Sequence, residues 1–139
     1  MDPVTLALAK SWAEGQFGGS RIVEMGSNSN GTYVRWENGL QICWRSVSQT
    51  DRAPSAQTTQ SLTVFRDVYT WSFPAAFSVA PMVLVSNPRL FSGGSAATHH
   101  MVTGYVGSVT VTSANIICES LKTFDAIDRE SLLAVGRWK

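Results

Sequence analysis

A chain of 139 residues has the size of one domain with room for a short appendage. Only 15% of its residues are charged and its formal net charge is +1, so nothing favours binding to nucleic acid or to an anionic membrane. No apolar run approaches the ~18 residues of a membrane span, and the first residues lack the basic start of a signal peptide.

The chain opens with a predicted helix of about a dozen residues. Asp2 is a suitable N-cap and Pro3 a suitable first helical residue. Val4, Leu8 and Trp12 then fall on one face. A helix this short is marginal alone in water, so it needs a partner. That partner is either the rest of its own domain or copies of itself.

The clearest local signal is a β-hairpin, TYVRWENGLQICWR, over residues 32–45. Asn38-Gly39 predicts a two-residue type I′ turn, which pairs Val34 with Cys43. In that register both faces are largely apolar, and a hairpin that is apolar on both faces is covered on both. One cover is the domain core, and the other is a helix, a loop or a neighbouring subunit.

The central stretch, YTWSFPAAFSVAPMVLVS at residues 69–86, organises the core. We expect a strand up to Phe73, an irregular turn through Ala80 and a buried strand from Met82, because proline cannot donate a ladder hydrogen bond inside a strand. The residues predicted to be largely buried are Trp71, Phe73, Phe77, Val83 and Val85.

Short apolar runs separated by turn residues recur along the rest of the chain. Further strands are predicted at 21–25, 62–65, 98–105, 109–112, 116–118 and 132–139. The connecting loops are predicted at 49–61, 87–97 and 121–131. The pattern shows neither βαβ alternation nor an internal repeat. It predicts an all-β protein, an antiparallel β-sandwich preceded by a short N-terminal helix.

The cysteines and histidines give no metal signature. Cys43 and Cys118 lack metal-ligand spacing, and without an export signal we expect two buried free thiols rather than one disulfide. His99 and His100 are adjacent, so on a strand they point to opposite faces and cannot chelate one metal within a subunit. They could each contribute to a metal on a threefold axis, but we interpret them as ordinary strand histidines. No cofactor is predicted.

Nothing in the sequence marks a catalytic site. Asp125, Asp128 and Glu130 cluster beside Arg129, without the spacing of a calcium loop. A glycosidase needs two carboxyl groups on either side of a sugar, but nothing in the sequence marks such a pair here. We interpret these residues as a solvated loop. There is no nucleophile-elbow, phosphate-loop or Cys-His motif. We therefore expect no enzyme.

Carbohydrate binding requires less of a sequence: an exposed aromatic ring and a few planar hydrogen-bonding groups nearby. Two loops and one strand end supply such residues. The candidate ligand-binding residues are Arg89, Phe91, Tyr105, Phe124, Asp125 and Arg129. In this interpretation an aromatic ring stacks on the sugar, while Arg and Asp bind its hydroxyl groups.

Three motifs, in chain order, resemble the C-terminal domain of bacteriophage tail-fibre proteins. They are GSNSNGTYVRWENGLQICW at 26–44, TWSFPAAFSVAPMV at 70–83 and AVGRWK at 134–139. The second motif also resembles, more weakly, the opening run of the H-type lectin domain. Together the motifs span nearly the whole chain after the predicted helix.

The resemblance implies a homotrimeric β-sandwich at the tip of a tail fibre in a virion, made in the host bacterial cytoplasm. Residues 1–20 would be a helix and hinge in the fibre neck, and residues 21–139 the tip domain. The implied partners are a bacterial surface receptor, the rest of the fibre and further copies of the chain. Neither nucleic acid nor membrane insertion is implied, and the lectin likeness implies a glycan receptor. A structural cap that only trimerises the fibre, and a polysaccharide-degrading enzyme, are the alternatives.

Overall fold

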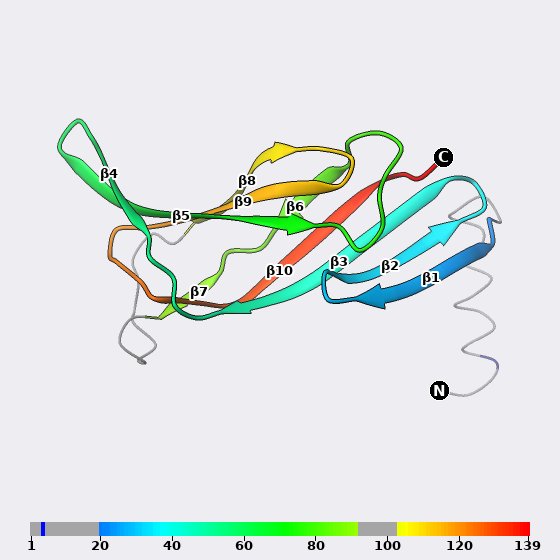
Figure 1. Cartoon of the computed structure of the whole chain (residues 1–139), viewed down its shortest axis with the longest axis horizontal. Helices are drawn as coiled ribbons and strands as arrows, with labels where there is room; N and C mark the ends of the chain where they lie inside the picture. Colours follow the sequence, from blue (N-terminus) through cyan, green and yellow to red (C-terminus); the bar gives the residue numbers. More distant parts are fainter. Residues whose placement is uncertain (1–3, 5–19, 92–102) are drawn as a thin grey trace.

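The computed structural model describes residues 4, 20–91 and 103–139 of the chain. These residues form two antiparallel β-sheets that pack face to face (Figure 1). The expected all-β, antiparallel architecture is confirmed. Apart from Val4, the predicted N-terminal helix lies outside the described residues, as do His99 and His100.

The first sheet is built around the last strand of the chain. Its order is β1 (Ile22–Asn28), β2 (Gly31–Trp36), β3 (Leu40–Gln49), β10 (Ala126–Arg137) and β6 (Met82–Val85). The short strand β7 (Arg89–Phe91) also pairs with β10, at residues 126–128. The strand β6 pairs with residues 132–135 of the same strand. The long strand β10 therefore has β3 along one edge and β6 and β7 along the other.

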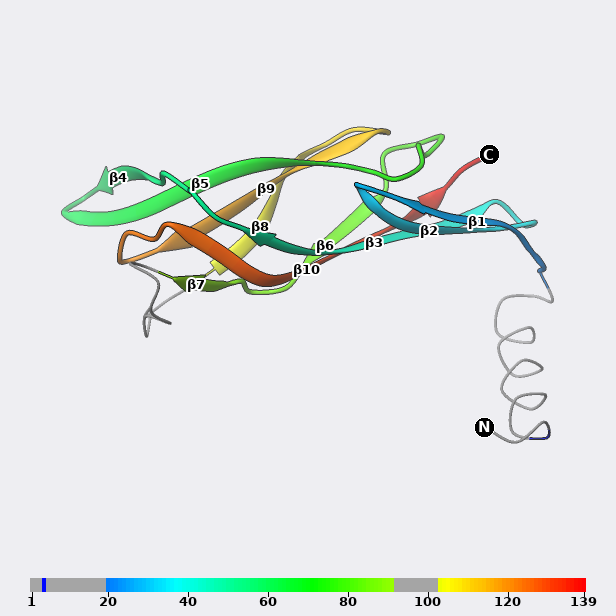
Figure 2. The ribbon, with the colours of Figure 1, turned by 60° about the horizontal axis from the view of Figure 1, so that its bottom comes forward.

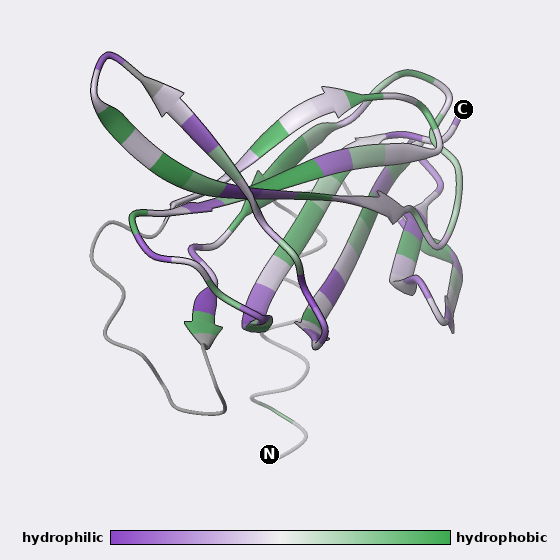
Figure 3. Cartoon of the chain, turned by 60° about the vertical axis from the view of Figure 1, so that its left-hand side comes forward, coloured by the Kyte–Doolittle hydropathy of each residue, from purple (hydrophilic) through white to green (hydrophobic). Residues whose placement is uncertain are grey.

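The second sheet covers one face of the first (Figure 2). Its order is β4 (Ser55–Thr59), β5 (Leu62–Ser72), β9 (Ser113–Ser120) and β8 (Thr103–Val109). The hairpin of β4 and the start of β5 projects beyond the rest of the sheet (Figure 1). Hydrophobic and hydrophilic residues alternate along the long strands, as expected for sheets with one buried face (Figure 3).

The core lies between the sheets and contains the predicted aromatic residues. Trp71, Phe73 and Phe77 are at most 6% exposed, and their rings pack edge to face with centroids 5.0 and 5.2 Å apart. The indole of Trp71 donates a 2.9 Å hydrogen bond to the carbonyl of Asn30. Val83 and Val85 are partly buried against the same cluster. The predicted core is confirmed for the three aromatic residues.

The hairpin exists, but its predicted register was wrong by one residue. Val34 pairs with Ile42, not with Cys43. The amide of Gly39 donates to the carbonyl of Trp36, and Gly39 has a φ of 90°. This is the three-residue loop with glycine in the left-handed region, rather than a two-residue type I′ turn.

A one-residue slip exchanges the two faces of a strand pair. Cys43 and its actual partner Tyr33 therefore face the core. Val34, the predicted partner of Cys43, lies on the opposite side of the hairpin. Trp44 stays 42% exposed and Ile42 is half-buried on the outer side. The outer side of the hairpin thus combines Val34 with Ile42 and Trp44.

Two predictions for the second sheet were wrong: a loop throughout residues 49–61, and a break at Arg66 and Asp67 between the strand at 62–65 and the central stretch. Residues 55–59 of the predicted loop form β4, and β5 runs through Arg66 and Asp67 without interruption. Both charges are accommodated because each has a partner: Arg66 pairs with Glu119, and Asp67 pairs with Arg52. An ion pair across strands lets a charged residue remain in a sheet.

Three other boundaries also differ from prediction. The strand β8 runs on to Val109, and the chain turns at residues 110–112, where the sequence predicted a strand over 109–112. There the Thr110 hydroxyl accepts hydrogen bonds from the amides of Thr112 and Ser113. Within the predicted loops, β7 forms at residues 89–91, and β10 begins at residue 126 rather than 132.

The two cysteines are free thiols, each fully buried, as predicted. Cys43 lies beside Gln41 and the carbonyl of Ala75. Cys118 lies beside the carboxyl group of Glu130. Burial raises the pKa of both thiols.

Candidate functional site

The pairing of β7 with β10 brings two sequence-predicted segments together. Arg89 pairs with Asp128, and Phe91 pairs with Ala126. The predicted loops at 87–97 and 121–131 therefore supply neighbouring strands at one end of the sandwich. We call this region the β7–β10 edge. Arg89 is exposed there and makes contacts within the chain.

A bulge in β10 sets the direction of side chains at this edge. The register with β3 shifts between Ile127 and Glu130, and Arg129 adopts a φ of 55°. The Arg129 side chain is 76% exposed, with Nε 3.4 Å from a carboxylate oxygen of Asp128. The other oxygen of Asp128 accepts a 2.7 Å hydrogen bond from Ser48. Asp128 is therefore held in place while Arg129 extends outward.

Phe124 does not belong to the exposed site. Its side chain is only 2% exposed and is part of the core cluster. It cannot stack on a sugar in this conformation, which corrects its predicted role. Its neighbour Asp125 is exposed, makes contacts within the chain and accepts a 2.8 Å hydrogen bond from the Arg52 amide at its backbone carbonyl.

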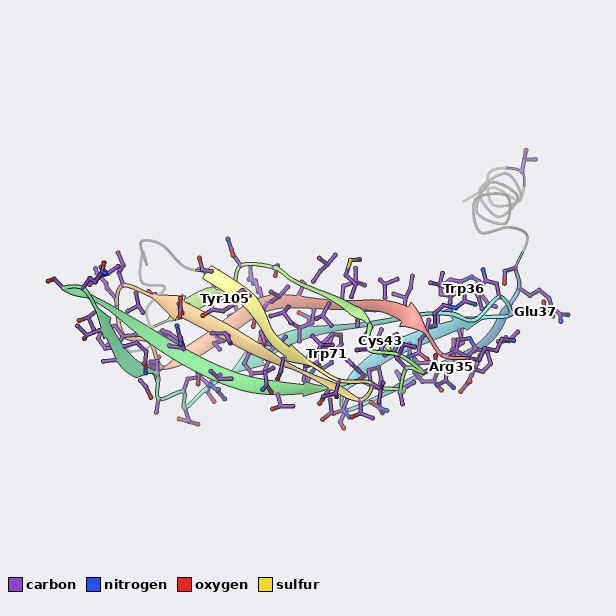
Figure 4. All side chains as sticks on the ribbon, turned by 90° about the horizontal axis from the view of Figure 1, so that it is seen from above. Arg35, Trp36, Glu37, Cys43, Trp71 and Tyr105 are labelled. Carbon is purple, nitrogen blue, oxygen red and sulfur yellow. The ribbon has the colours of Figure 1, made fainter. Side chains whose placement is uncertain are left out.

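Tyr105 lies on a different surface from the β7–β10 edge. It belongs to β8 and pairs with Ile117 on the outer face of the second sheet. Its phenol donates a 2.8 Å hydrogen bond to Oε1 of Glu119, which also accepts from Nε of Arg66. Figure 4 shows Tyr105 toward one end of the molecule and Arg35 toward the other.

Sequence reasoning missed Arg66 and Glu119. It interpreted Arg66 and Asp67 as a break between strands, which hid the alternation of Arg66, Val68 and Thr70. That period of two is the signal that places these three side chains on one face of a strand.

A buried polar cluster was also missed. The carboxyl group of Glu130 is fully buried and accepts hydrogen bonds from the phenol of Tyr69 and the thiol of Cys118. Desolvation raises the pKa of Glu130, and the hydrogen bonds from Tyr69 and Cys118 oppose that shift. Nearby, Arg52 pairs with Asp67 and lies over the Tyr69 ring.

The outer face of the first sheet is apolar across five strands. One cross-strand row contains Met25, Val34, Ile42, Val135 and Met82. The next row contains Thr32, Trp44, Leu133 and Leu84. Within these rows Met25 is 67% exposed, Met82 60% and Leu84 50%, whereas Val34 is buried at 8%. We call this surface the apolar outer face.

Among the described residues, no three or more His, Cys, Asp or Glu side chains are grouped so that they could hold a metal ion. In the same part of the chain, no helix has both the length and the apolar character needed to cross a membrane.

No family model matches the sequence, and comparison with curated proteins gives no match. Solved structures do match. An N-truncated R1-type pyocin tail fibre is 20% identical with a TM-score of 0.55, and the match covers 91% of this chain and 94% of that one. A C-terminal part of the P. aeruginosa R1 pyocin fibre is 21% identical with a TM-score of 0.55, covering 91% of this chain and 31% of that chain. For a C-terminal part of the P. aeruginosa R2 pyocin fibre the values are 18% and 0.51, covering 91% and 29%. The chain therefore shares the fold of these tail-fibre structures.

Proposed function

We propose that this chain is the distal domain of a tail fibre, from a phage or a phage-like particle, that attaches the particle to a bacterial surface. The observation that carries the proposal is the fold match to a tail-fibre structure over nearly the full length of both chains. Three sequence motifs that resemble tail-fibre C-terminal domains support it independently, because they come from the sequence and not from the coordinates.

The receptor in this proposal is a surface glycan. The exposed groups at the β7–β10 edge have suitable chemistry, since Asp128 is fixed by Ser48 and the Arg129 side chain extends into solvent. Ionised groups of this kind form charge-assisted hydrogen bonds with sugar hydroxyl groups. Single sites on such a surface bind weakly, and several copies on one particle raise avidity by about 10²–10⁴.

The same proposal includes assembly into a homotrimer. A monomer rarely leaves a large contiguous apolar patch in water, and the apolar outer face has exposed Trp44, Met82 and Leu84 on adjacent or nearby strands. We propose that copies of this chain cover that face. A structural cap without receptor binding is the second candidate function, and it is favoured by the same surface.

Binding to whole cells tests the attachment function. The fluorescently labelled protein is incubated with a panel of bacterial strains, and retention on cells is measured with and without purified surface polysaccharide from the same strain. We expect retention on a subset of strains and competition by their polysaccharide. Retention on no strain would favour the structural cap. Release of shorter oligosaccharides from the polysaccharide would instead identify a degrading enzyme.

A further inference from the structure

In the part of the chain that the structure describes, a tyrosine, a glutamate and an arginine meet on one sheet in two clusters. In the first cluster Tyr33, Glu24 and Arg35 come from β1 and β2. In the second cluster Tyr105, Glu119 and Arg66 come from β8, β9 and β5. Tyr105 and Arg35 lie toward opposite ends of the sandwich (Figure 4). The two clusters have the same composition but differ in how completely their polar groups are used.

In the first cluster each carboxylate oxygen and each guanidinium nitrogen has a partner within the protein. Glu24 accepts from the Tyr33 phenol at Oε1 and from Nη1 of Arg35 at Oε2. Arg35 also donates from Nε to Gln41 and from Nη2 to the carbonyl of Ala76. Because both carboxylate oxygens and all three guanidinium nitrogens are occupied, this cluster is structural.

The second cluster is left open. Both the Tyr105 phenol and Nε of Arg66 donate to the same oxygen of Glu119, Oε1. Among the described residues, no hydrogen-bond donor contacts the second oxygen, Oε2. The Arg66 side chain is 41% exposed, and its Nε donates to Glu119. A carboxylate acceptor and a guanidinium donor are thus held side by side on a partly exposed surface.

Beside this cluster, the outer face of the second sheet carries an apolar row of side chains. Strand pairing places Val68, Ile117 and Tyr105 in one row across β5, β9 and β8. Val68 is 49% exposed, and Ile117 and Tyr105 are half-buried. The row is therefore an accessible apolar strip that ends in an aromatic residue.

Polar rows border this strip on both sides. The row of Arg66, Glu119 and Thr103 lies on one side. On the other side Thr70 pairs with Asn115, and the two side chains share a 3.0 Å hydrogen bond. Strands lie about 4.8 Å apart and same-face residues about 7 Å apart along a strand. The three rows then measure roughly 10 by 14 Å, which is the size of one or two sugar rings.

We propose that this surface, the Tyr105 platform, is a binding subsite for a hydroxyl-rich bacterial polysaccharide. The apolar C–H face of a sugar ring lies on the strip of Val68, Ile117 and Tyr105. The hydroxyl groups at the ring edge bind Arg66 and Oε2 of Glu119. The platform rests on the proposed attachment function and adds a second contact surface, distinct from the β7–β10 edge.

The two glutamate clusters provide a matched pair of variants. Glu119→Gln and Glu24→Gln each replace one carboxylate by an amide in a cluster of the same composition. Binding is measured on an array of purified bacterial surface polysaccharides, alongside retention on the source cells. Tyr105→Ala removes the ring, and Arg89→Ala alters the β7–β10 edge. Melting temperatures establish that each variant is folded.

We expect Glu119→Gln and Tyr105→Ala to weaken polysaccharide binding at least about tenfold, because each removes a charge-assisted hydrogen bond or the stacking ring. Glu24→Gln should bind like the wild type. Equal binding by wild type, Glu119→Gln and Tyr105→Ala would overturn the platform while leaving the attachment function intact. Retention on cells without binding to any polysaccharide would also overturn the platform. Binding to neither cells nor polysaccharides would overturn both proposals.

Discussion

Glu130 on β10 accepts a hydrogen bond from the phenol of Tyr69 on β5, so that a carboxyl group links the two sheets inside the core. Glu130 is fully buried, and Tyr69 is 9% exposed. The bulge in β10 directs Glu130 inward, and Gly104 on β8 leaves the space, since a Cβ there would lie 3.0 Å from Oε1 of Glu130. A buried carboxyl group is costly when ionised, which makes this link sensitive to pH.

The first prediction concerns that sensitivity. The folded-state pKa of Glu130 is raised, mainly by desolvation, above its ordinary value of 4.5. Its contribution to stability is therefore fully present below the unfolded-state pKa and is lost as pH rises through the folded-state pKa. We expect Glu130→Gln to remove this loss. Urea denaturation between pH 4.5 and 8 should show the free energy of unfolding falling more steeply for the wild type. Parallel pH profiles would contradict the raised pKa.

The second prediction concerns the aromatic core. Phe73 contacts the rings of both Trp71 and Phe77, so Phe73→Ala should lower the free energy of unfolding by about 3–5 kcal/mol. The loss combines transfer energy with a cavity. Val79→Ala, in the same turn at a position 65% exposed, is the control and should change stability by less than about 0.5 kcal/mol. Urea denaturation of both variants gives the comparison.

The third prediction concerns the apolar outer face. If copies of the chain cover it, Leu84→Glu places a charge in the interface and should convert a homotrimer into monomers. Val68→Glu, at a position 49% exposed on the other sheet, introduces the same charge outside that interface. Analytical ultracentrifugation at micromolar concentration separates the species. A monomeric wild-type protein would show that the apolar outer face is not used for self-association.

The fourth prediction concerns the thiols. Burial raises the pKa of Cys43 and Cys118, so both carry little thiolate at neutral pH. Both should react slowly with a chromogenic disulfide reagent in the folded protein and rapidly in urea. Intact-mass measurement should find the two thiols unbridged. A mass lower by the two hydrogens of a disulfide would contradict the free-thiol assignment.

The fifth prediction concerns the β7–β10 edge. Arg89→Ala combined with Phe91→Ala should abolish retention on host cells and leave the melting temperature and the oligomeric state unchanged. Both positions belong to the three-residue strand β7, which pairs only at this edge among the described strands. Normal retention by the double variant, with loss on deleting residues of the 49–61 segment, would move the site to the β4–β5 hairpin.

The sequence was sufficient for the architecture where local chemistry was unambiguous. Aromatic and β-branched runs bounded by Pro74 and Pro81 predicted the core turn and the start of β6, because proline positions are limited by hydrogen bonding. The register of the hairpin was not predictable in the same way. Asn38-Gly39 suits both a two-residue turn and a three-residue turn, and only packing against the second sheet distinguishes them.

The candidate site was less predictable, because strand pairing brings together residues that are distant in the sequence. Loops 87–97 and 121–131 were selected separately for their mix of aromatic and charged residues, and the pairing of Arg89 with Asp128 joins them. Conversely, Phe124 was predicted to be an exposed ring that binds a sugar, but it is buried. Arg66 was interpreted as part of a break between strands, and nothing local to Arg66 or Glu119 shows that they meet across two strands.

The central position of β10 has a consequence for folding. In the first sheet β10 supplies the pairing partners of β3, β6 and β7, which come from residues far earlier in the chain. Before β10 is synthesised, these strands have open hydrogen-bonding edges next to apolar side chains, and such edges template aggregation. Closing distant strand pairs late also makes folding slow. The unpaired edges of β3, β6 and β7 are therefore the parts of this sheet most open to aggregation until β10 pairs with them.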